Sequence, residues 1–186
     1  MSLAPPKKNL EIIEHIQRWV DRIVIGENLC PFARPSIDRG QFEIKVSEAT
    51  NIEEAYRDAL THIEYFCEPS NVHLDSLLLV FSTTLHEFEV YLDCLSACEY
   101  ALETLELEGI IQLASFHPDY LFDGTDVTDH AHWTNRAPFP AIHLLRESSV
   151  SEALNSVTHP DKIPQRNIEH LRKLSPTELK HLFDDL

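Results

Sequence analysis

The stretch Ser76-Leu77-Leu78-Leu79-Val80-Phe81 decides the fold. It holds no charged side chain, and its six residues have the length of a strand rather than that of a helix. A continuous apolar run of this kind is typical of a strand that other elements cover on both faces. The stretch therefore predicts an inner strand of a sheet packed between two layers.

Amphipathic helices are predicted before and after this strand. Apolar side chains repeat at helical spacing over about 9–26, over 52–63 and over about 86–107. Thr50 precedes Glu53 by three residues, which is the signature of a capping box and predicts where the second helix begins. The second and third helices therefore occupy the positions of crossovers between successive strands.

Three further strands complete the predicted sheet. Residues 41–47 alternate between apolar and polar side chains, and residues 110–116 form another apolar run. Strands that alternate with helices through short connections are typical of a parallel sheet. A fourth strand over 139–146 follows an irregular stretch, 117–138, and could therefore pair antiparallel beside one of the others.

The prediction for the whole chain is a single α/β (or α+β) domain over 1–186. About four strands form a mixed, mostly parallel sheet that helices flank, and a helical C-terminal segment follows over 149–157, 163–174 and 175–186. We expect residues 1–8 to form a flexible N-terminus.

Charge and composition exclude several classes of partner. The chain has 15 Lys and Arg residues against 31 Asp and Glu residues, so its formal net charge of -16 repels nucleic acid and anionic membrane surfaces. No apolar run approaches the roughly 18 residues of a membrane span, and the start has no apolar core like that of a signal peptide. We therefore expect a cytoplasmic protein with reduced cysteines. The sequence predicts no oligomeric state.

Glycine is too scarce for the common nucleotide-binding motifs. The four glycines of the chain are widely separated, whereas phosphate-binding loops need closely spaced glycines. The chain also lacks the G-x-S-x-G and H-E-x-x-H motifs of hydrolases and zinc proteases. No cofactor is predicted.

The candidate site lies where the third strand ends, at Phe116-His117-Pro118-Asp119-Tyr120. Ligands of open α/β sheets bind outside the carboxyl ends of the strands, and long ordered loops are disproportionately functional. His117 is therefore a candidate catalytic residue, and the loop after it adds the candidate binding residues Asp119, Tyr120 and Asn135.

Cationic and nucleophilic side chains complete the candidate site. Arg136, and Arg146 ten residues later, could hold a carboxylate or phosphate, although Arg136 could instead pair with a loop aspartate. His143 is a candidate binding residue, with a core histidine satisfied by one hydrogen bond as the alternative. Cys30 lies in the loop "NLCPFARP" between two helix breakers and is the candidate nucleophile.

Metal binding has weak support in the sequence. His130 and His132 with the nearby aspartates could hold a divalent cation loosely, and Cys30, His117 and His143 are reasonable zinc ligands. Neither set has the spacing of a known closed site. No metal site is predicted.

Four motifs resemble those of a known family. They are "NLCPFA" (28–33), "EGIIQLASFHPDYLFDGT" (108–125), "TNRAPFPAIHLLRESSV" (134–150) and "IPQRNIEHLRKL" (163–174). In this order and spacing they resemble the bacterial family called domain of unknown function 1415, over about 19–174. The resemblance implies a small bacterial cytoplasmic protein and implies no catalytic residue.

Three functional hypotheses follow, and whether the protein is an enzyme stays open. In the first, Cys30 attacks an anionic small molecule, His117 acts as general base and Arg136 holds the anionic group. In the second, the same residues bind a small ligand or metal without chemistry. In the third, they form a polar network that fixes the loop, in which case a concave pocket is absent and the Arg136 guanidinium is fully occupied by protein groups.

Overall fold

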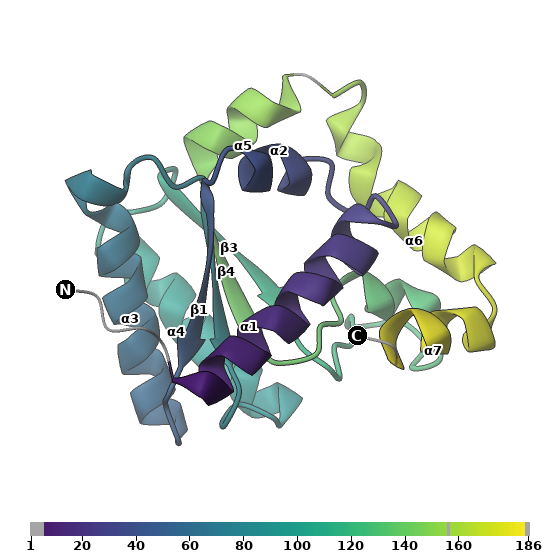
Figure 1. Cartoon of the computed structure of the whole chain (residues 1–186), viewed down its shortest axis with the longest axis horizontal. Helices are drawn as coiled ribbons and strands as arrows, with labels where there is room; N and C mark the ends of the chain where they lie inside the picture. Colours follow the sequence, from purple (N-terminus) through teal and green to yellow (C-terminus); the bar gives the residue numbers. More distant parts are fainter. Residues whose placement is uncertain (1–5, 156, 185–186) are drawn as a thin grey trace.

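A computed structural model describes residues 6–155 and 157–184. One four-stranded sheet has the order β1-β2-β4-β3 (Figure 1), with β1 at Phe42–Ser47, β2 at Ser76–Phe81, β3 at Ile111–Phe116 and β4 at Ala141–Arg146. β1 pairs parallel with β2, and β4 pairs antiparallel with both β2 and β3. The predicted mixed α/β fold is confirmed. β1, β2 and β3 run in one direction, and β4 runs in the opposite direction between β2 and β3. Of the three strand pairings in the sheet, two are therefore antiparallel.

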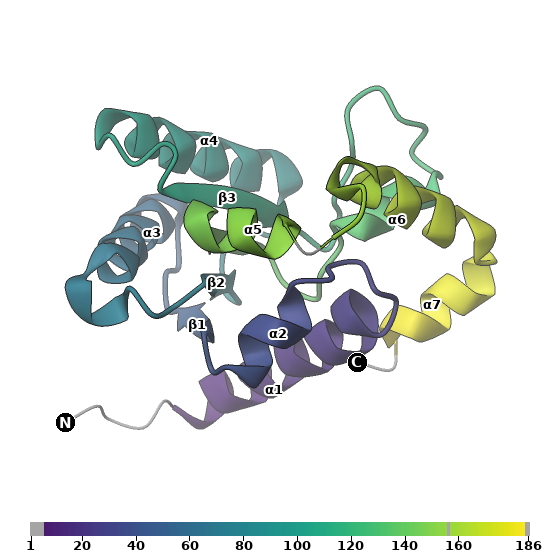
Figure 2. The same cartoon turned by 90° about the horizontal axis from the view of Figure 1, so that it is seen from above.

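The crossover helices cover one face of the sheet (Figure 2). They are α3 at Ile52–Cys67 and α4 at Phe88–Thr104. Leu77, Leu79 and Phe81 of β2 pack against them in one apolar cluster. Burying each such side chain stabilises the fold by roughly 1.5–3 kcal/mol relative to leaving it exposed.

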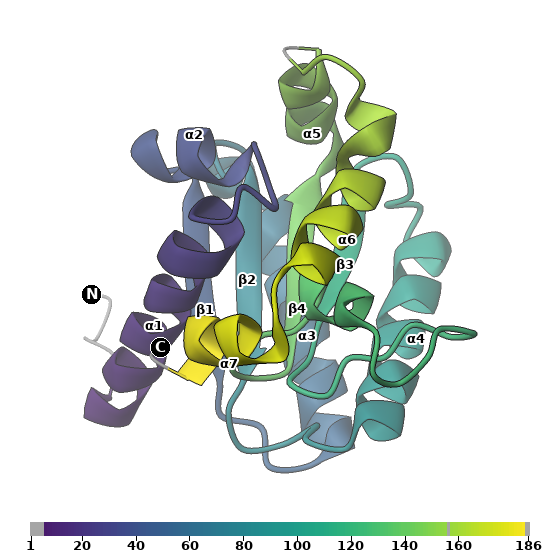
Figure 3. The same ribbon diagram turned by 90° about the vertical axis from the view of Figure 1, so that its right-hand side faces the viewer.

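Helices from both ends of the chain cover the other face, which we call the α1 face. They are α1 at Lys7–Trp19, the π-helix η1 at Val20–Ile25, α6 at Ile163–Lys173 and α7 at Pro176–Asp184. Leu78 and Val80 of β2 pack with Ile16 and Leu171 on this side. Figure 3 looks onto this face, with α1 and α6 in front of the strands. β2 is thus buried on both faces, as the apolar run predicts.

The shorter helices connect these layers. They are α2 at Ala33–Asp38, α5 at Glu147–Leu154 and the 3-10 helices η2 at Pro69–Asn71, η3 at His130–Thr134 and η4 at Pro160–Lys162. Of the predicted flexible N-terminus, residues 1–5 lie outside the described residues, and α1 already begins at Lys7. Within 6–155 and 157–184, no helix is both long enough and apolar enough to cross a membrane.

The capping box of α3 differs from the prediction by one residue. Asn51 is the N-cap, and its side chain accepts the backbone N–H of Glu54 at 3.0 Å. The Glu54 carboxylate in turn accepts the backbone N–H and the hydroxyl of Thr50, each at 2.8 Å. The predicted pair of Thr50 and Glu53 is therefore wrong, because Asn51 is at least as good a cap as threonine and takes the position itself.

Candidate functional site

The end of the first helix positions Cys30. The π-helical turns leave Val24 as a shared acceptor, whose carbonyl oxygen receives the backbone N–H groups of Leu29 at 2.9 Å and Cys30 at 3.2 Å. Gly26 is required here, because a Cβ atom at this position would lie 2.1 Å from the carbonyl oxygen of Arg22. The two bonds to Val24 hold Cys30 beside the end of the π-helix.

The hydroxyl of Tyr91 holds the ends of two strands together. It donates to the carbonyl oxygen of Ala141 at 2.9 Å and accepts the backbone N–H of Phe116 at 3.1 Å. On the α1 face, the indole N–H of Trp19 donates to the carbonyl oxygen of Arg136 at 3.2 Å. These bonds fix the end of β3 and the returning loop next to the first helix.

A cavity of about 350 Å³ lies between these segments and α6. Most of its lining side chains are apolar, including Ile23, Leu29, Phe116, Phe122 and Ile163. Cys30 and Arg136 line the same cavity, together with Asn135 and Asn167. The structure therefore brings together two of the three predicted catalytic residues in an apolar, concave site.

The guanidinium of Arg136 has a hydrogen-bond donor without a partner among the described residues. Its guanidinium carbon lies 4.6 Å from the centroid of the Trp133 ring. Its Nε is buried and has no hydrogen-bond partner within 6–155 and 157–184. Burial lowers the pKa of Arg136, although the charge of Asp119 opposes this shift. Asp129, which could have paired with Arg136, instead binds Arg172 with N–O distances of 2.9 and 2.7 Å.

The surroundings of Cys30 favour the neutral thiol over the nucleophilic thiolate. Burial raises the pKa of Cys30, while hydrogen bonds from the backbone N–H groups of Phe32 and Ala33 act in the opposite direction. The thiolate is the nucleophilic form, and a raised pKa makes it scarce near neutral pH.

His117 lies on the other side of the sheet from this cavity. Its Nδ1 accepts the backbone N–H of Asp119 at 3.0 Å, so its Nε2 carries the proton and donates to the carbonyl oxygen of Leu85 at 3.0 Å. The ring packs against Phe88 and Tyr91 of α4, and burial lowers the pKa of His117. With both nitrogens bonded to the backbone, the ring does not act on a group in the cavity.

The remaining polar residues of the predicted loop site bond mainly to one another and to the backbone. The hydroxyl of Tyr120 lies 3.2 Å from that of Ser115. The amide of Asn135 donates to the carbonyl oxygen of Ser115 at 3.0 Å and accepts from Thr134 at 2.9 Å. Asp119 is exposed. Asn135 therefore lines the cavity with an amide that is already bonded.

Arg146 is a structural clamp at the far end of β4. Its guanidinium donates to the carbonyl oxygens of Leu74 at 2.9 Å, Phe66 at 3.0 Å and Asn71 at 3.3 Å. It also lies over the ring of Phe66, 4.5 Å from the centroid. The structure thus places Arg146 away from Arg136 and occupies its donors.

His143 lies within β4, between the rings of Phe42 and Phe116, at centroid distances of 6.0 and 6.2 Å. Burial lowers the pKa of His143 to about 4, so the ring is neutral at physiological pH. Its Nε2 is buried and has no hydrogen-bond partner among the described residues. Phe116 connects this histidine to the cavity, because it lines the cavity itself.

The histidines of the long loop serve its internal structure. Nδ1 of the buried His132 accepts the backbone N–H of Phe122 at 3.0 Å, and its Nε2 donates to the carbonyl oxygen of Asp126 at 2.8 Å. Nδ1 of His130 lies 3.2 Å from the carbonyl oxygen of Leu171. In the part of the chain that the structure describes, no group of three or more His, Cys, Asp or Glu side chains is arranged to hold a metal ion.

A second hollow, of about 450 Å³, opens along α3 and β1. Several of its charged side chains already have protein partners. Nδ1 of His62 lies 3.3 Å from a carboxylate oxygen of Asp58, and the Glu54 carboxylate accepts from Thr50. The cavity on the α1 face is therefore the better candidate site.

Sequence reasoning missed several side chains that build this cavity. Trp133 supports the guanidinium of Arg136, and Ile163, Asn167 and Ile168 of α6 close the cavity. The segment "IPQRNIEHLRKL", which carries the α6 residues, stands out in the sequence as a motif but gives no sign of its partner. Contact between α6 and the loop after β3 depends on tertiary packing.

Fold and site together define a small α/β protein with a mixed four-stranded sheet and an apolar cavity that contains a partly buried arginine. The chain belongs to the family described as "Protein of unknown function (DUF1415)", whose model matches residues 11–181. No significant match was found among curated proteins or solved structures.

Proposed function

We propose that this protein binds a small molecule that carries an anionic group on an apolar body. The observation that carries the proposal is the buried Nε of Arg136, which has no hydrogen-bond partner among the described residues. The side chain of Arg136 lines an apolar cavity. The cavity volume of about 350 Å³ falls within the range of small-molecule sites, roughly 300–1,000 Å³.

The chemistry of the guanidinium identifies the kind of ligand. An arginine presents its donors in a planar fork that matches a carboxylate or a phosphate. Leaving a buried donor unbonded costs roughly 1–3 kcal/mol, so a purely structural role would favour a protein acceptor for Nε. The apolar walls favour an acid with a hydrocarbon body over a small inorganic anion.

The same observations favour binding over the two other hypotheses. A network that only fixes the loop requires that no pocket is present and that protein groups occupy the whole Arg136 guanidinium. The cavity disagrees with the first requirement, and the unpartnered Nε disagrees with the second. Catalysis by Cys30 loses its predicted base, because His117 bonds to backbone groups on both ring nitrogens. The cytoplasmic location and the exclusion of nucleic acid stay predictions from the sequence.

The proposal is tested by thermal denaturation with chemically simple probes. Phenylacetate, hexanoate and phenyl phosphate are compared with the uncharged phenylacetamide on the wild type, on Arg136→Met and on Arg57→Met. Arg57 is exposed on α3, so its substitution changes the net charge equally without touching the cavity.

At least one of the anionic probes should stabilise the wild type and Arg57→Met but not Arg136→Met. A probe at 100 times its Kd stabilises by about 2.7 kcal/mol, which raises the Tm of a protein of this size by roughly 5–11 °C. Phenylacetamide should have no comparable effect. If no anionic probe stabilises the protein, or if Arg136→Met responds like the wild type, the proposal fails.

A further inference from the structure

Buried polar atoms without partners gather on the α1 face. The described residues contain three such side-chain atoms, namely Ser36 Oγ, Arg136 Nε and His143 Nε2. Arg136 lines the cavity, and Ser36 lies in α2, whose Ile37 packs in the apolar cluster of this face. Unsatisfied buried polar groups are rare in folded proteins and require an explanation. Their position on one side of the sheet points to a ligand that contacts more than Arg136.

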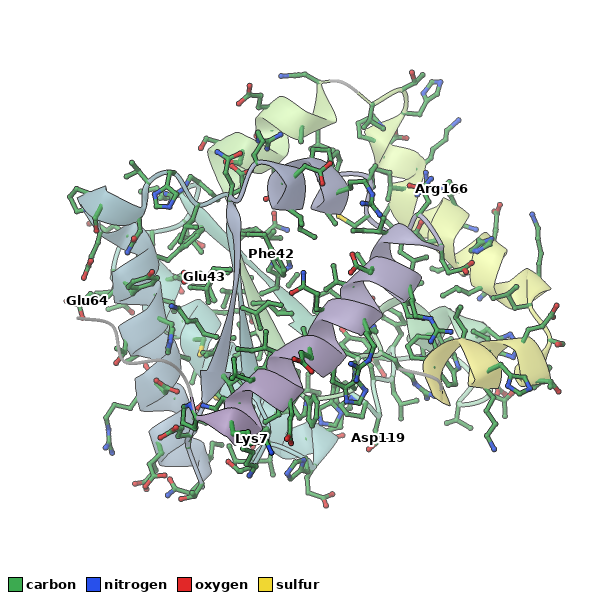
Figure 4. All side chains as sticks on the ribbon, in the orientation of Figure 1. Lys7, Phe42, Glu43, Glu64, Asp119 and Arg166 are labelled. Carbon is green, nitrogen blue, oxygen red and sulfur yellow. The ribbon has the colours of Figure 1, made fainter. Side chains whose placement is uncertain are left out.

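The register of the sheet places His143 on this face. His143 pairs directly with Leu78 of β2 and Ala114 of β3, and Leu78 belongs to the apolar cluster of the α1 face. Directly paired residues project from the same face of a sheet. Figure 4 shows the neighbouring alternation on β1, where Phe42 lies on the α1 side and Glu43 on the α3 side.

The Nε2 atom of His143 is enclosed by protein. It is buried and has no hydrogen-bond partner among the described residues, and burial lowers the pKa of the ring to about 4. The rings of Phe42 and Phe116 flank the imidazole, and Phe116 also lines the cavity of Arg136. The ring of Phe116 therefore separates His143 from the cavity.

The spacing along β4 gives the distance from the end of the strand, where Phe116 lines the cavity, to His143. Ala141 pairs with Phe116 at the end of the strand, and His143 lies two residues further. Two residues of a strand span about 7 Å. A six-membered ring or a short alkyl chain covers a distance of this order.

The chemistry of a neutral imidazole selects the group that can meet it. One ring nitrogen of a neutral histidine donates and the other accepts, so Nε2 has one of these roles according to the tautomer. A hydroxyl group both donates and accepts and therefore suits either tautomer. A second carboxylate does not suit this position, because the neutral ring supplies no charge to offset its burial.

We propose that the ligand is a hydroxylated apolar acid, whose anionic group binds Arg136 and whose hydroxyl group reaches Nε2 of His143 past the ring of Phe116. This inference rests on the proposed function and adds a second recognition point to the same site. His143 is then a residue that determines specificity, and Phe116 must shift to admit the ligand.

The test compares acids with and without the hydroxyl group by isothermal titration calorimetry. The hydroxylated probes are 4-hydroxybenzoate, 4-hydroxyphenylacetate and 3-(4-hydroxyphenyl)propanoate, which differ in length, and each is paired with its parent acid. The proteins are the wild type, Arg136→Met, His143→Leu and, as a second apolar replacement, His143→Phe.

In the wild type, at least one hydroxylated acid should bind about tenfold or more tightly than its parent, as expected for a hydrogen bond to a buried group. Replacing His143 should abolish that advantage and leave the Kd of the parent acid within about threefold. The inference is overturned if no hydroxylated acid binds the wild type more tightly than its parent acid. It is also overturned if the tighter binding persists in both His143 variants. The proposed function survives that outcome if the parent acids still require Arg136, and fails if Arg136→Met binds them as well as the wild type does.

Discussion

Two arginines that both lie over aromatic rings should differ in how much stability they lose on the same substitution to methionine. Arg146→Met removes a cation whose donors bond to three carbonyl oxygens, so the substitution should lower the free energy of unfolding by about 3–5 kcal/mol. Arg136→Met loses the contact with Trp133, about 0.5–2 kcal/mol, but also removes a buried unpartnered donor that costs about 1–3 kcal/mol. Its net effect on the free energy of unfolding should therefore lie between a loss of about 1 kcal/mol and a gain of about 2.5 kcal/mol.

Equilibrium unfolding in urea measures both changes, and methionine keeps the apolar part of each side chain in place. In thermal terms, Arg146→Met should lower the Tm by roughly 6–20 °C, whereas Arg136→Met should lower it by at most about 4 °C or raise it by up to about 10 °C. Equal losses in the two variants would refute the reasoning, because Arg136 would then stabilise the fold as Arg146 does. A small effect would agree with the proposal that Arg136 serves ligand binding rather than the stability of the fold.

Three further predictions concern His143, His117 and Cys30. Folding lowers the pKa of His143 from 6.5 to about 4, so the unfolded chain binds the proton first and stability falls as the pH drops through this window. Between pH 7 and pH 4, the free energy of unfolding in urea should therefore fall by about 3 kcal/mol more in the wild type than in His143→Leu. A difference between the two proteins that does not change with pH would contradict the burial of this ring. His117→Phe should lower the free energy of unfolding by about 2–4 kcal/mol, because the buried carbonyl oxygen of Leu85 and the partly buried N–H of Asp119 lose their partner, and a neutral effect would show that these bonds contribute little. Alkylation of Cys30 by iodoacetamide at pH 7, followed by mass spectrometry, should be slower than that of the same thiol in unfolded protein and slower still with a bound acid, whereas rapid labelling would indicate an activated thiolate.

Local patterns predicted the elements of the fold better than their pairing. The apolar run at Ser76–Phe81 has the bounds of β2 and is buried on both faces, because such a run is stable only when both faces are covered. The insertion of β4 between β2 and β3 is not encoded in any local period. It depends on which strand edges remain open after the crossovers have formed.

The candidate site was only partly predictable, and strand geometry explains one difference. Successive side chains of a strand point to opposite faces. Phe116 points to the α1 face, so His117 points toward α4, where Tyr91 and Leu85 meet it. The hypothesis that pairs His117 with Cys30 overlooks this alternation.

Arg136 and Cys30 share the cavity because of contacts between distant segments. Cys30 follows the first helix, Arg136 follows the long loop, and α6 adds a wall from Ile163 onward. No spacing in the sequence brings these three segments together. The free Nε of Arg136 is likewise a property of packing, since the sequence offers many acidic partners.

The Nε–H signal of Arg136 in proton–nitrogen NMR spectra of the intact protein tests the central claim most directly. Arg146 provides an internal control, because its Nε–H already donates to the carbonyl oxygen of Leu74 at 2.9 Å. The account predicts that phenylacetate, hexanoate or phenyl phosphate shifts the Arg136 signal in a saturable manner and leaves the Arg146 signal in place. An Arg136 signal that no anionic probe moves at millimolar concentration would contradict the proposal that this cavity binds an anionic ligand.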